Sequence, residues 1–552
     1  MGRTVSGTGV VAGVVKAPVV WLRTAQISPE PCAPVEQQER EAEAERLREA
    51  VEAVALGYEG RGARADGQAA EVLSATAALA RDRGWLRPAL GQVSAGRPAV
   101  AAMASAIDEF VAVFTQIGGV MAERVADLRD IRNRIAARLA GNPEPGLPHP
   151  DQPSILLADD LAPADTADLD PELFIAIATR LGGPTGHTAI IARQRGLPCL
   201  VGVTDLDEIR DGETVVLDGE AGVIHRDLGN AEATRLLDSD ARRRAVTDGW
   251  HGPAHTADGV NVELLANVAD GDSAVAAAAA PVEGAGLFRT ELGFLGAPTE
   301  PSVHDQAERY SAVLRAFGSR KVVVRTLDAG TDKPVPFASL PDEPNPALGV
   351  RGHRLTRAQP GLLSRQLDAI ALASAEGPAP WVMAPMISTV DEAAEFAAQC
   401  RSRGLTPGVM VEVPAAALMA DRFLEEVDFV SIGTNDLAQY TMAADRLSPE
   451  LAPLTDPWQP AVLKLVAMTA DAGQRAGKPV GVCGEAASDP ILACVLVGLG
   501  VTSLSMAHLS VPSVGVQLAE VTLAQCRAAA QQALSAPTAA AAREAARAEL
   551  TR

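Results

Sequence analysis

The last 300 or so residues carry the pattern that most restricts how this chain can fold. Apolar, strand-like runs recur there with helical intervals between them, and they begin near Val260, Gly286, Val322, Trp381, Gly408, Phe429, Val480 and Leu504. Eight alternating β and α segments over roughly this length are typical of a (β/α)8 barrel. We therefore expect a TIM barrel over residues 251–552 of an α/β multidomain protein.

The amino-terminal part predicts a second α/β domain that contains a helical insertion. Residues 4–22 are rich in Val and broken by Gly and Pro, which favours short strands. Residues 35–139 have Leu, Ala and Val at helical spacing, and a Pro-rich connector follows at 142–154. Further strand-like runs start at Ile155, Leu173, Cys199 and Thr214. We predict an α/β domain built from 1–32 and 144–227, a helical domain at 33–143 inserted into it, and a linker helix at 228–250.

Composition excludes several classes of protein. The 552 residues hold 48 Lys and Arg against 70 Asp and Glu, a formal net charge of −22 that disfavours nucleic-acid binding. The six cysteines form neither a CxxC pair nor a Cys/His cluster, so a disulfide framework or structural zinc is not expected. The apolar run at 491–501 is far shorter than the roughly 20 residues of a membrane span. We expect a cytoplasmic protein without membrane insertion.

Polar residues follow several strand-like runs of the expected barrel. The second, third, fifth, sixth and seventh runs end with Arg289, Arg325, Glu412, Asn435 with Asp436, and Cys483. The carboxyl ends of barrel strands meet at one rim, where active sites of such barrels are built. Arginine forks suit phosphate or carboxylate oxygens, and two isolated carboxylates suit Mg²⁺. These residues predict a site for a small phosphorylated acid, and Lys333, in a turn-rich loop after the third run, is a candidate phosphate contact.

A second constellation lies at residues 182–193, with the sequence GGPTGHTAIIAR. A Gly-rich turn presents His187 where an apolar, helix-forming segment begins. The positive end of a helix stabilises an anion placed there, which suits an imidazole that receives a phosphoryl group by nucleophilic attack. A histidine in an apolar setting is more often a packed residue, but the Gly-rich turn favours the nucleophile.

Several motifs, in order, resemble Enzyme I of the bacterial sugar phosphotransferase system, the phosphoenolpyruvate-protein phosphotransferases, over essentially the whole chain. The matching stretches are residues 158–163, 182–193, 286–291, 324–328, 345–351, 411–416, 431–441, 445–446 and 483–485. The resemblance implies an enzyme that moves the phosphoryl group of phosphoenolpyruvate to its own histidine and then to the carrier protein HPr, releasing pyruvate. It also implies that the helical domain binds HPr and that the barrel carries a homodimer interface.

The resemblance further assigns a role to individual residues. It implies that His187 is phosphorylated, that Thr166 orients its ring, and that Cys483 protonates enolpyruvate. Phosphoenolpyruvate would be held by Arg289, Arg325, Asn435 and Arg446, with Arg351 and Lys333 nearby, and Mg²⁺ by Glu412 and Asp436. The chain departs from the family pattern before the histidine, where Pro184 and Gly186 replace a cation and a hydroxyl.

Two other functions are compatible with parts of this pattern. A dikinase or phosphoenolpyruvate synthase also couples a swinging histidine domain to such a barrel, but it needs a nucleotide-binding domain, and the chain has no GxxxxGK[ST] loop. A noncatalytic regulator would bind only carrier proteins or phosphoenolpyruvate. Its expected signature is absence of pyruvate production when HPr is present.

Overall fold

The computed structural model describes the chain except for residues 1–2, 23–33, 63–72, 74–75, 118, 143–146, 149, 162–168, 183–186, 295–296, 298, 331–334, 336, 339–342, 344, 360, 376, 378, 447–450 and 552. The chain divides into two compact units, residues 1–240 and 241–552. Each unit has apolar cores of its own.

The first unit holds an eight-stranded sheet with the strand order β1-β8-β7-β3-β4-β5-β6-β2. The strands are β1 (Thr4–Ser6), β2 (Thr8–Val11), β3 (Val14–Leu22), β4 (Ser154–Ala158), β5 (Phe174–Thr179), β6 (Cys199–Val201), β7 (Thr214–Asp218) and β8 (Val223–His225). From β3 to β6 neighbouring strands run parallel, and the other pairs are antiparallel. Strands from both sides of the helical segment therefore share one sheet, as the sequence predicts.

The central strand β4 explains why the sequence shows an unbroken apolar run there. Ile155 and Leu157 belong to the core on one face of the sheet, while Leu156 and Ala158 belong to the core on the other. A strand buried on both faces needs no polar alternation.

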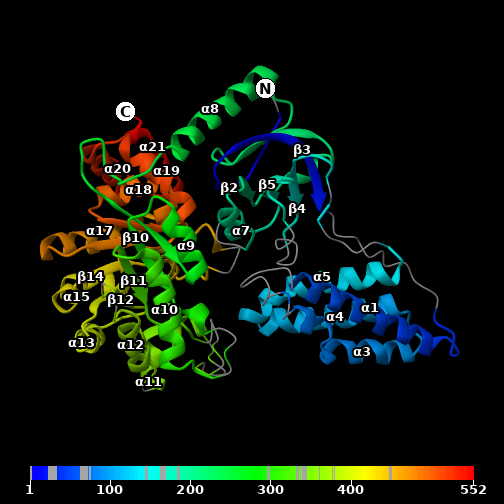
Figure 1. The fold of residues 1–552 in the computed structure, drawn as a ribbon. Coiled ribbons are helices and arrows are strands. Elements are labelled where there is room, and N and C mark those ends of the chain that lie inside the picture. The colour runs from blue at the N-terminus through cyan, green and yellow to red at the C-terminus, as the bar shows by residue number, and fades with distance from the viewer. Residues whose placement is uncertain are drawn as a thin grey trace. The chain divides into compact units, whose positions relative to one another are not determined.

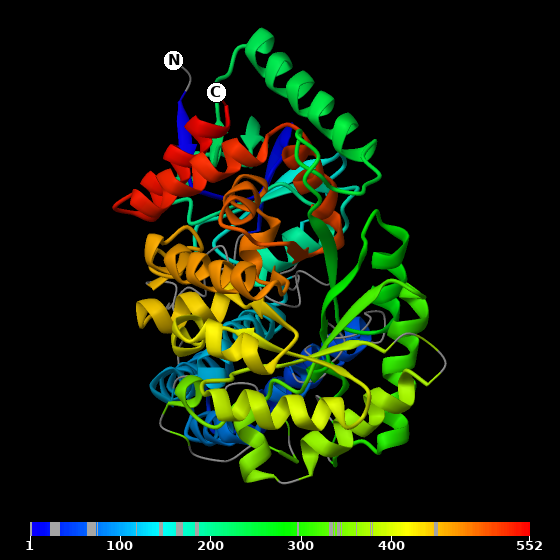
Figure 2. The same cartoon turned by 90° about the vertical axis from the view of Figure 1, so that its left-hand side faces the viewer.

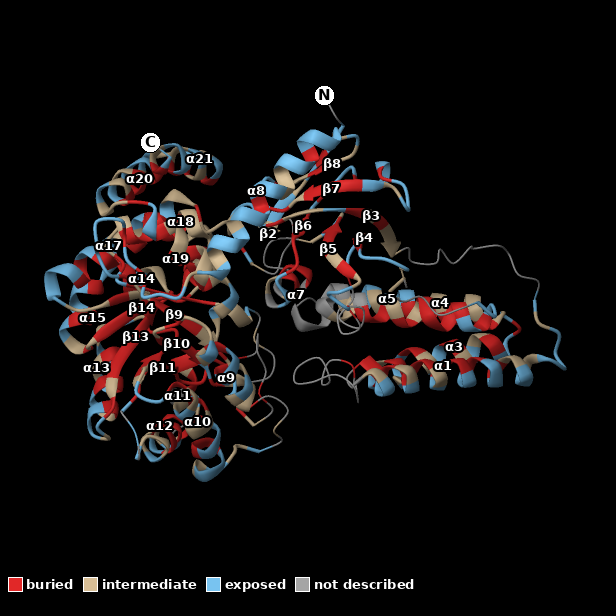
Figure 3. Cartoon of the chain, turned by 45° about the horizontal axis from the view of Figure 1, so that its top comes forward, coloured by how far each residue is buried: buried red, intermediate tan, exposed pale blue. Residues whose placement is uncertain are grey.

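The described helices between β3 and β4 pack around an apolar core of their own. They are α1 (Arg40–Gly62), α3 (Arg83–Ser94), α4 (Ala99–Ile117) and α5 (Gly119–Leu139). Leu47, Val54, Trp85, Ile107 and Ile131 are fully buried between them, and the buried faces point inward in Figure 3. The predicted helical block is thus helical, and α8 (Asn230–Asp248) occupies the predicted linker. The exact domain boundaries stay predictions.

The second unit is a closed barrel of parallel strands with the order β10-β11-β12-β13-β14-β15-β16-β9. The strands are β9 (Glu263–Val268), β10 (Gly284–Arg289), β11 (Lys321–Arg325), β12 (Trp381–Ala384), β13 (Thr406–Val411), β14 (Phe429–Ile432), β15 (Val480–Val482) and β16 (Ser503–Met506). Helices surround the strands (Figures 1 and 2): α9 (Gly271–Ala279), α10 (Val303–Phe317), α12 (Leu362–Ala373), α13 (Val390–Arg401), α15 (Ala420–Glu426), α17 (Pro460–Ala476), α18 (Pro490–Gly498) and α19 (Val511–Ala519). The predicted TIM barrel is confirmed.

Local signals in the sequence set where the outer helices begin. Thr389 accepts from the main-chain N–H of Glu392, whose side chain accepts from the N–H of Thr389, so α13 starts with a capping box. Ser302 and Asp305 do the same for α10.

The apolar run at residues 491–501 is a core helix. Leu492 to Val497 are all buried in α18, against which α19 and α20 (Leu523–Ser535) pack, followed by α21 (Ala539–Leu550). Among the described residues, no helix has the length and apolar character that crossing a bilayer requires.

Candidate active site

The carboxyl ends of the barrel strands bring the predicted site residues to one rim. Arg289 and Arg325 are the last residues of β10 and β11, Glu412 directly follows β13, and Cys483 directly follows β15. Asp436 lies in the first turn of α16 (Thr434–Met442), which begins after β14. Because all strands are parallel in a closed barrel, their carboxyl ends face the same side. The positive end of α16 favours a carboxylate at that position.

Arg325 is buried and held by carboxylates on two sides. Its guanidinium pairs with Glu291, in the short 3-10 helix Glu291–Gly293, and its Nη1 lies 3.2 Å from Oδ2 of Asp328. Burial lowers its pKa, but Glu291, Asp328 and Glu412 outweigh this and hold it above the usual value. Among the described atoms, Nε of Arg325 and Oε2 of Glu291 are buried without a hydrogen-bond partner. Arg325 is therefore charged and keeps a donor for a ligand.

Arg351 lies between two acidic side chains and is 1% exposed. Its Nε and Nη2 donate to Asp328 at 3.0 and 3.2 Å. Its Nη1 and Nη2 also donate to Oδ1 and Oδ2 of Asp436, each at 3.2 Å. Asp328, fully buried, thus joins Arg351 to Arg325. Neither Asp328 nor Glu291 could be given a role from the sequence, although each stands close to a predicted arginine.

Glu412 is a buried carboxylate whose charge is poorly compensated. It is 1% exposed, and burial together with the charges of Asp436 and Asp328 raises its pKa to about 7. Arg325 and Arg351 act in the opposite direction but do not restore the ordinary value. An uncompensated negative charge of this kind favours a bound cation.

The surroundings of Glu412 leave one of its oxygens accessible to a ligand. The main-chain N–H of Met386 donates to Oε1 at 2.7 Å. On the other side, a Cβ atom at Gly433 would lie 3.0 Å from Oε2. Glycine at 433 therefore keeps the space beside Oε2 open.

The acidic residues of this rim fit a magnesium ion. In the part of the chain that the structure describes, no group of three or more His, Cys, Asp and Glu side chains is arranged to hold a metal. Mg²⁺ is commonly held by only one or two carboxylates, together with water and substrate phosphate. Glu412 and Asp436 supply that donor set.

Cys483 is a buried thiol at the same rim. It is 3% exposed, and its Sγ donates to the carbonyl oxygen of Ile432 at 3.6 Å. Its apolar surroundings are Leu287, Val323, Met383, Met410 and Phe429. Burial raises its pKa to about 11, against the opposing effects of a hydrogen bond with Ser431 and the charges of Arg325 and Arg289. The thiol therefore carries its proton at neutral pH and can serve as an acid.

Three further predicted residues lie around this cluster. Oδ1 of Asn435 accepts from the main-chain N–H of Glu485 at 3.1 Å. The NH₂ group of Asn435 takes no part in this hydrogen bond. Nη1 of Arg446 lies 3.7 Å from Oδ2 of Asp436. Arg289 is exposed at the end of β10. Arg446 is partly exposed.

Some predicted residues fall where the structure gives no description. Lys333 and Thr166 lie outside the described residues, as do Pro184 and Gly186. For His187 the structure describes the backbone but not the side chain.

His187 is the first residue of α7 (His187–Arg195), which follows β5 and packs on β2 and β6. The hydroxyl of Thr188 donates to Oδ1 of Asp160 at 3.1 Å, and Ala189 and Ala192 are fully buried. The beginning of the helix is therefore fixed to the sheet of its unit. The predicted position of the histidine at a helix start is found.

A buried polar network that the sequence did not indicate supports the arginine-bearing loops. Gln366 in α12 accepts from the N–H of Leu327 at 2.9 Å and donates to Thr290 and Tyr310, each at 3.1 Å. Thr290 in turn donates to the carbonyl of Arg325 at 2.9 Å. These residues look like ordinary helix or loop positions in the sequence, so only the folded chain identifies them.

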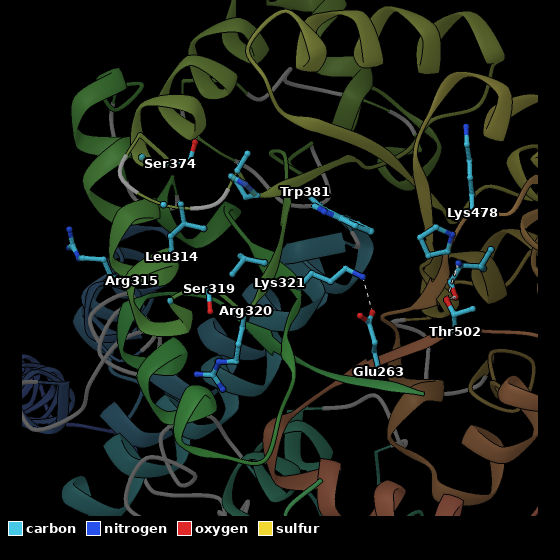
Figure 4. A pocket seen from close by; sticks show the side chains of 18 of the residues that line it. Glu263, Leu314, Arg315, Ser319, Arg320, Lys321, Ser374, Trp381, Lys478 and Thr502 are labelled. Atoms are coloured by element: carbon cyan, nitrogen blue, oxygen red, sulfur yellow. Dashed lines mark hydrogen bonds and ion pairs between the residues drawn. The ribbon is translucent and has the colours of Figure 1, made fainter. Parts of the chain in front are cut away.

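A cavity of about 1290 Å³ opens at the opposite end of the barrel (Figure 4). It is lined by Glu263, Lys321 and Trp381, the first residues of β9, β11 and β12. Nζ of Lys321 lies 2.8 Å from Oε2 of Glu263 and 3.9 Å from the ring centre of Trp381, and Lys478 donates to two main-chain carbonyls. None of the predicted site residues that the structure describes lines it. We assign it no part in the reaction.

The fold and the rim define the class of protein. Three family models match the chain: PEP-utilising enzyme, N-terminal, over residues 6–124; PEP-utilising enzyme, mobile domain, over 150–222; and PEP-utilising enzyme, PEP-binding domain, over 244–523. The last covers the barrel with its arginines, carboxylates and thiol.

Relatives that match over most of their length show which family within this class the chain belongs to. The phosphoenolpyruvate-protein phosphotransferase of Streptomyces coelicolor is 48% identical over 556 residues, covering 100% of both chains. Those of Haloferax volcanii and Geobacillus stearothermophilus are 42% and 38% identical, covering 81% and 79% of each chain. The chain belongs to the phosphoenolpyruvate-protein phosphotransferase family and is an enzyme, as the motifs predicted. A dikinase or a noncatalytic regulator is not favoured.

Proposed function

We propose that this enzyme transfers the phosphoryl group of phosphoenolpyruvate to His187 and then to the carrier protein HPr, releasing pyruvate. The buried cluster of arginines and carboxylates at the barrel rim, in a chain 48% identical to a phosphotransferase over its whole length, carries this proposal. We also propose that the reaction takes place in the cytoplasm.

Different barrel residues bind the substrate and the metal ion. Arg325 is held in place by Glu291, and with Arg289 and Arg446 it neutralises the oxygens of the phosphate and carboxylate groups. The free NH₂ group of Asn435 orients the substrate. Glu412 and Asp436 hold Mg²⁺, which when bound supplies further positive charge toward the transferring phosphoryl group.

Phosphoryl transfer and protonation use two different groups of the chain. The bond between phosphorus and the enol oxygen breaks while a bond to Nε2 of His187 forms, in line with the leaving oxygen. The enolate left behind takes the proton of the Cys483 thiol on its methylene carbon and leaves as pyruvate. A pKa of about 11 keeps that proton in place until the enolate forms.

The histidine and the rim belong to different compact units, residues 1–240 and 241–552. The proposal therefore includes a rigid-body movement about α8 that brings His187 to the rim and later returns it. It also includes orientation of the imidazole by Thr166, a phosphate contact from Lys333, HPr binding by the helical segment and a homodimer formed through the barrel.

Incubation with phosphoenolpyruvate carrying a labelled phosphate, with Mg²⁺ and purified HPr, tests the proposal. We expect acid-labile label on the wild-type enzyme and on HPr, and none on His187→Ala. His225→Ala, which changes another histidine of the same unit in β8, is the matched control and should keep the label. Label retained by His187→Ala contradicts the assignment, and incorporation that depends on ATP would favour a dikinase instead.

A further inference from the structure

Both oxygens of Asp436 are already occupied in this structure. Nη1 of Arg351 donates to Oδ1 and Nη2 donates to Oδ2, each at 3.2 Å. The Arg351 side chain is 1% exposed and that of Asp436 is 8% exposed, so water screens this pair very little. A magnesium ion that takes an oxygen of Asp436 as ligand has to compete with this guanidinium.

Glu412, the other carboxylate of the site, has different partners. Oε1 of Glu412 accepts from a main-chain N–H, and no ion pair to Glu412 occurs among the described residues. The two carboxylates thus differ: Asp436 pairs with a guanidinium group of the chain, and Glu412 accepts a hydrogen bond from a neutral main-chain N–H.

A divalent ion changes the charge balance of the site. Three carboxylates, of Glu291, Asp328 and Asp436, pair with three guanidinium groups, of Arg325, Arg351 and Arg446. Glu412 and Arg289 add one charge of each sign at the same rim, so a bound divalent ion leaves these groups with an excess of positive charge. When an ion is bound, the contact between Arg351 and Asp436 is therefore the ion pair that the charge balance of the site needs least.

Arg351 has a second anchor that remains when Asp436 is released. Its Nε and Nη2 donate to the fully buried Asp328 at 3.0 and 3.2 Å. The guanidinium can give up Asp436 without leaving its place.

We propose that Arg351 is a built-in counterion of the metal site: it neutralises Asp436 in the metal-free enzyme, and Mg²⁺ displaces it from that carboxylate while Asp328 retains it. This inference rests on the proposed function, since that function supplies the metal. The donors that Asp436 gives up then become available to the substrate's anionic groups, so metal binding precedes tight substrate binding.

Replacing Arg351 by lysine tests whether the guanidinium group competes with the metal for Asp436 or only contributes a positive charge. Arg351→Lys keeps the positive charge, but its single ammonium cannot hold Asp328 and Asp436 in two forks at once. If Arg351 competes with the metal, Arg351→Lys binds Mg²⁺ about tenfold more tightly, because charge-assisted hydrogen bonds to Asp436 are lost. If only net charge matters, the affinity stays the same.

The test is calorimetric titration of the full-length enzyme with Mg²⁺ in the absence of phosphoenolpyruvate. The matched control is Arg365→Lys, because Arg365 makes a two-pronged ion pair with Glu300, at 2.9 and 2.6 Å, in the same unit, and neither residue belongs to the cluster around Asp436. We expect tighter binding for Arg351→Lys only. An unchanged or weaker affinity overturns the proposal.

A folding defect of Arg351→Lys would also be decisive. Circular dichroism in EDTA and in saturating Mg²⁺ then shows whether the ion restores the structure. Restoration supports the proposal, since Mg²⁺ replaces the guanidinium hydrogen bonds that Asp436 has lost, and failure to restore the structure contradicts the proposal. The labelling assay on the wild-type enzyme tests the proposed function separately. If the wild type transfers label but Arg351→Lys does not bind Mg²⁺ more tightly, only this inference is contradicted. If Arg351→Lys binds Mg²⁺ more tightly but the wild type transfers no label, only the proposed function is contradicted.

Discussion

The main-chain N–H of Met386 donates to Oε1 of Glu412 at 2.7 Å from a backbone whose φ is 59°. This left-handed conformation is uncommon for a residue with a side chain and costs energy. Met386 follows β12 and is 1% exposed, so the surrounding barrel holds it in place. The chain accepts local strain to direct a neutral donor at a carboxylate that has no direct cation partner among the described residues.

Glu412→Gln should therefore stabilise the protein while it removes function. The amide oxygen can still accept from Met386, but the buried charge disappears, and we expect the free energy of unfolding in EDTA to rise by about 1–3 kcal/mol at pH 8. Label transfer from phosphoenolpyruvate should fall at least about 100-fold. Urea unfolding and the labelling assay measure the two effects.

Glu425→Gln is the control for Glu412→Gln, because Glu425 forms only an exposed ion pair with Arg422. It should change neither quantity appreciably. A Glu412→Gln protein that is less stable than wild type would show that the charge is better compensated than the structure indicates.

Cys483→Ser should separate the two chemical steps. A serine hydroxyl is a far weaker acid than a thiol, so we expect pyruvate release to slow by about 100-fold or more. Label should still reach His187 in a single turnover, because that step needs no proton from Cys483. Pyruvate reduction by a coupled dehydrogenase and quenched-flow labelling distinguish the steps; equal loss of both would place Cys483 in phosphate binding instead.

The same thiol should react slowly with alkylating agents. Because its pKa is about 11, the fraction of thiolate at pH 8 is small. The rate of iodoacetamide labelling of the Cys483 peptide, followed by mass spectrometry, should keep rising up to about pH 10. A plateau near pH 8 would mean that Arg325 and Arg289 outweigh burial.

The sequence predicted the barrel well because each strand is a short apolar run between amphipathic helices. Arg289 and Arg325 could be placed at one rim from order alone, since parallel strands force their carboxyl ends together. Neither argument needs any knowledge of side-chain contacts.

The contacts themselves could not be predicted. Asp328 joins Arg325 and Arg351 because the fold brings residues 328 and 351 together across 23 positions of the chain, which the spacing of residues in the sequence does not reveal. Arg351 was expected near the substrate, which stays a prediction, and its bonds to Asp328 and Asp436 are seen only in the structure. The φ angle of Met386 could not be predicted either. Methionine usually has a negative φ, so the positive value depends on how the residue is packed.

The helical segment of the first unit should show a pH-dependent stability that comes from Asp127 in α5. Burial raises the pKa of this carboxyl from 3.8 to about 6, against the opposing effect of Arg124, whose Nη1 lies 3.3 Å away. The folded state therefore holds the proton more tightly, so stability is fullest below about pH 4 and falls as pH rises through about 6. Asp127→Asn should remove this fall.

Hydrogen exchange of α5 peptides at pH 4.5 and 7.5 measures this effect locally. We expect Asp127→Asn to gain up to about 3 kcal/mol of protection at pH 7.5 and little at pH 4.5. Asp108→Asn is the control, since Asp108 makes an exposed ion pair with Arg132 within the same helices. A gain of equal size at both pH values would assign the effect to packing rather than to titration.

Gly433→Ala should weaken metal binding without unfolding the barrel. A Cβ atom there would lie 3.0 Å from Oε2 and 3.1 Å from Cβ of Glu412, and 3.1 Å from Sδ of Met410, so these side chains have to shift by a few tenths of an ångström. The backbone at 433 has φ of −89°, which alanine adopts without strain. We expect about tenfold weaker Mg²⁺ binding by calorimetry, because Oε2 of Glu412 is displaced. Gly91→Ala in α3, where a Cβ atom meets nothing within 4 Å, should leave the affinity unchanged and stabilise its helix slightly. An unaltered affinity in Gly433→Ala would show that Oε2 of Glu412 is not the oxygen that the metal uses.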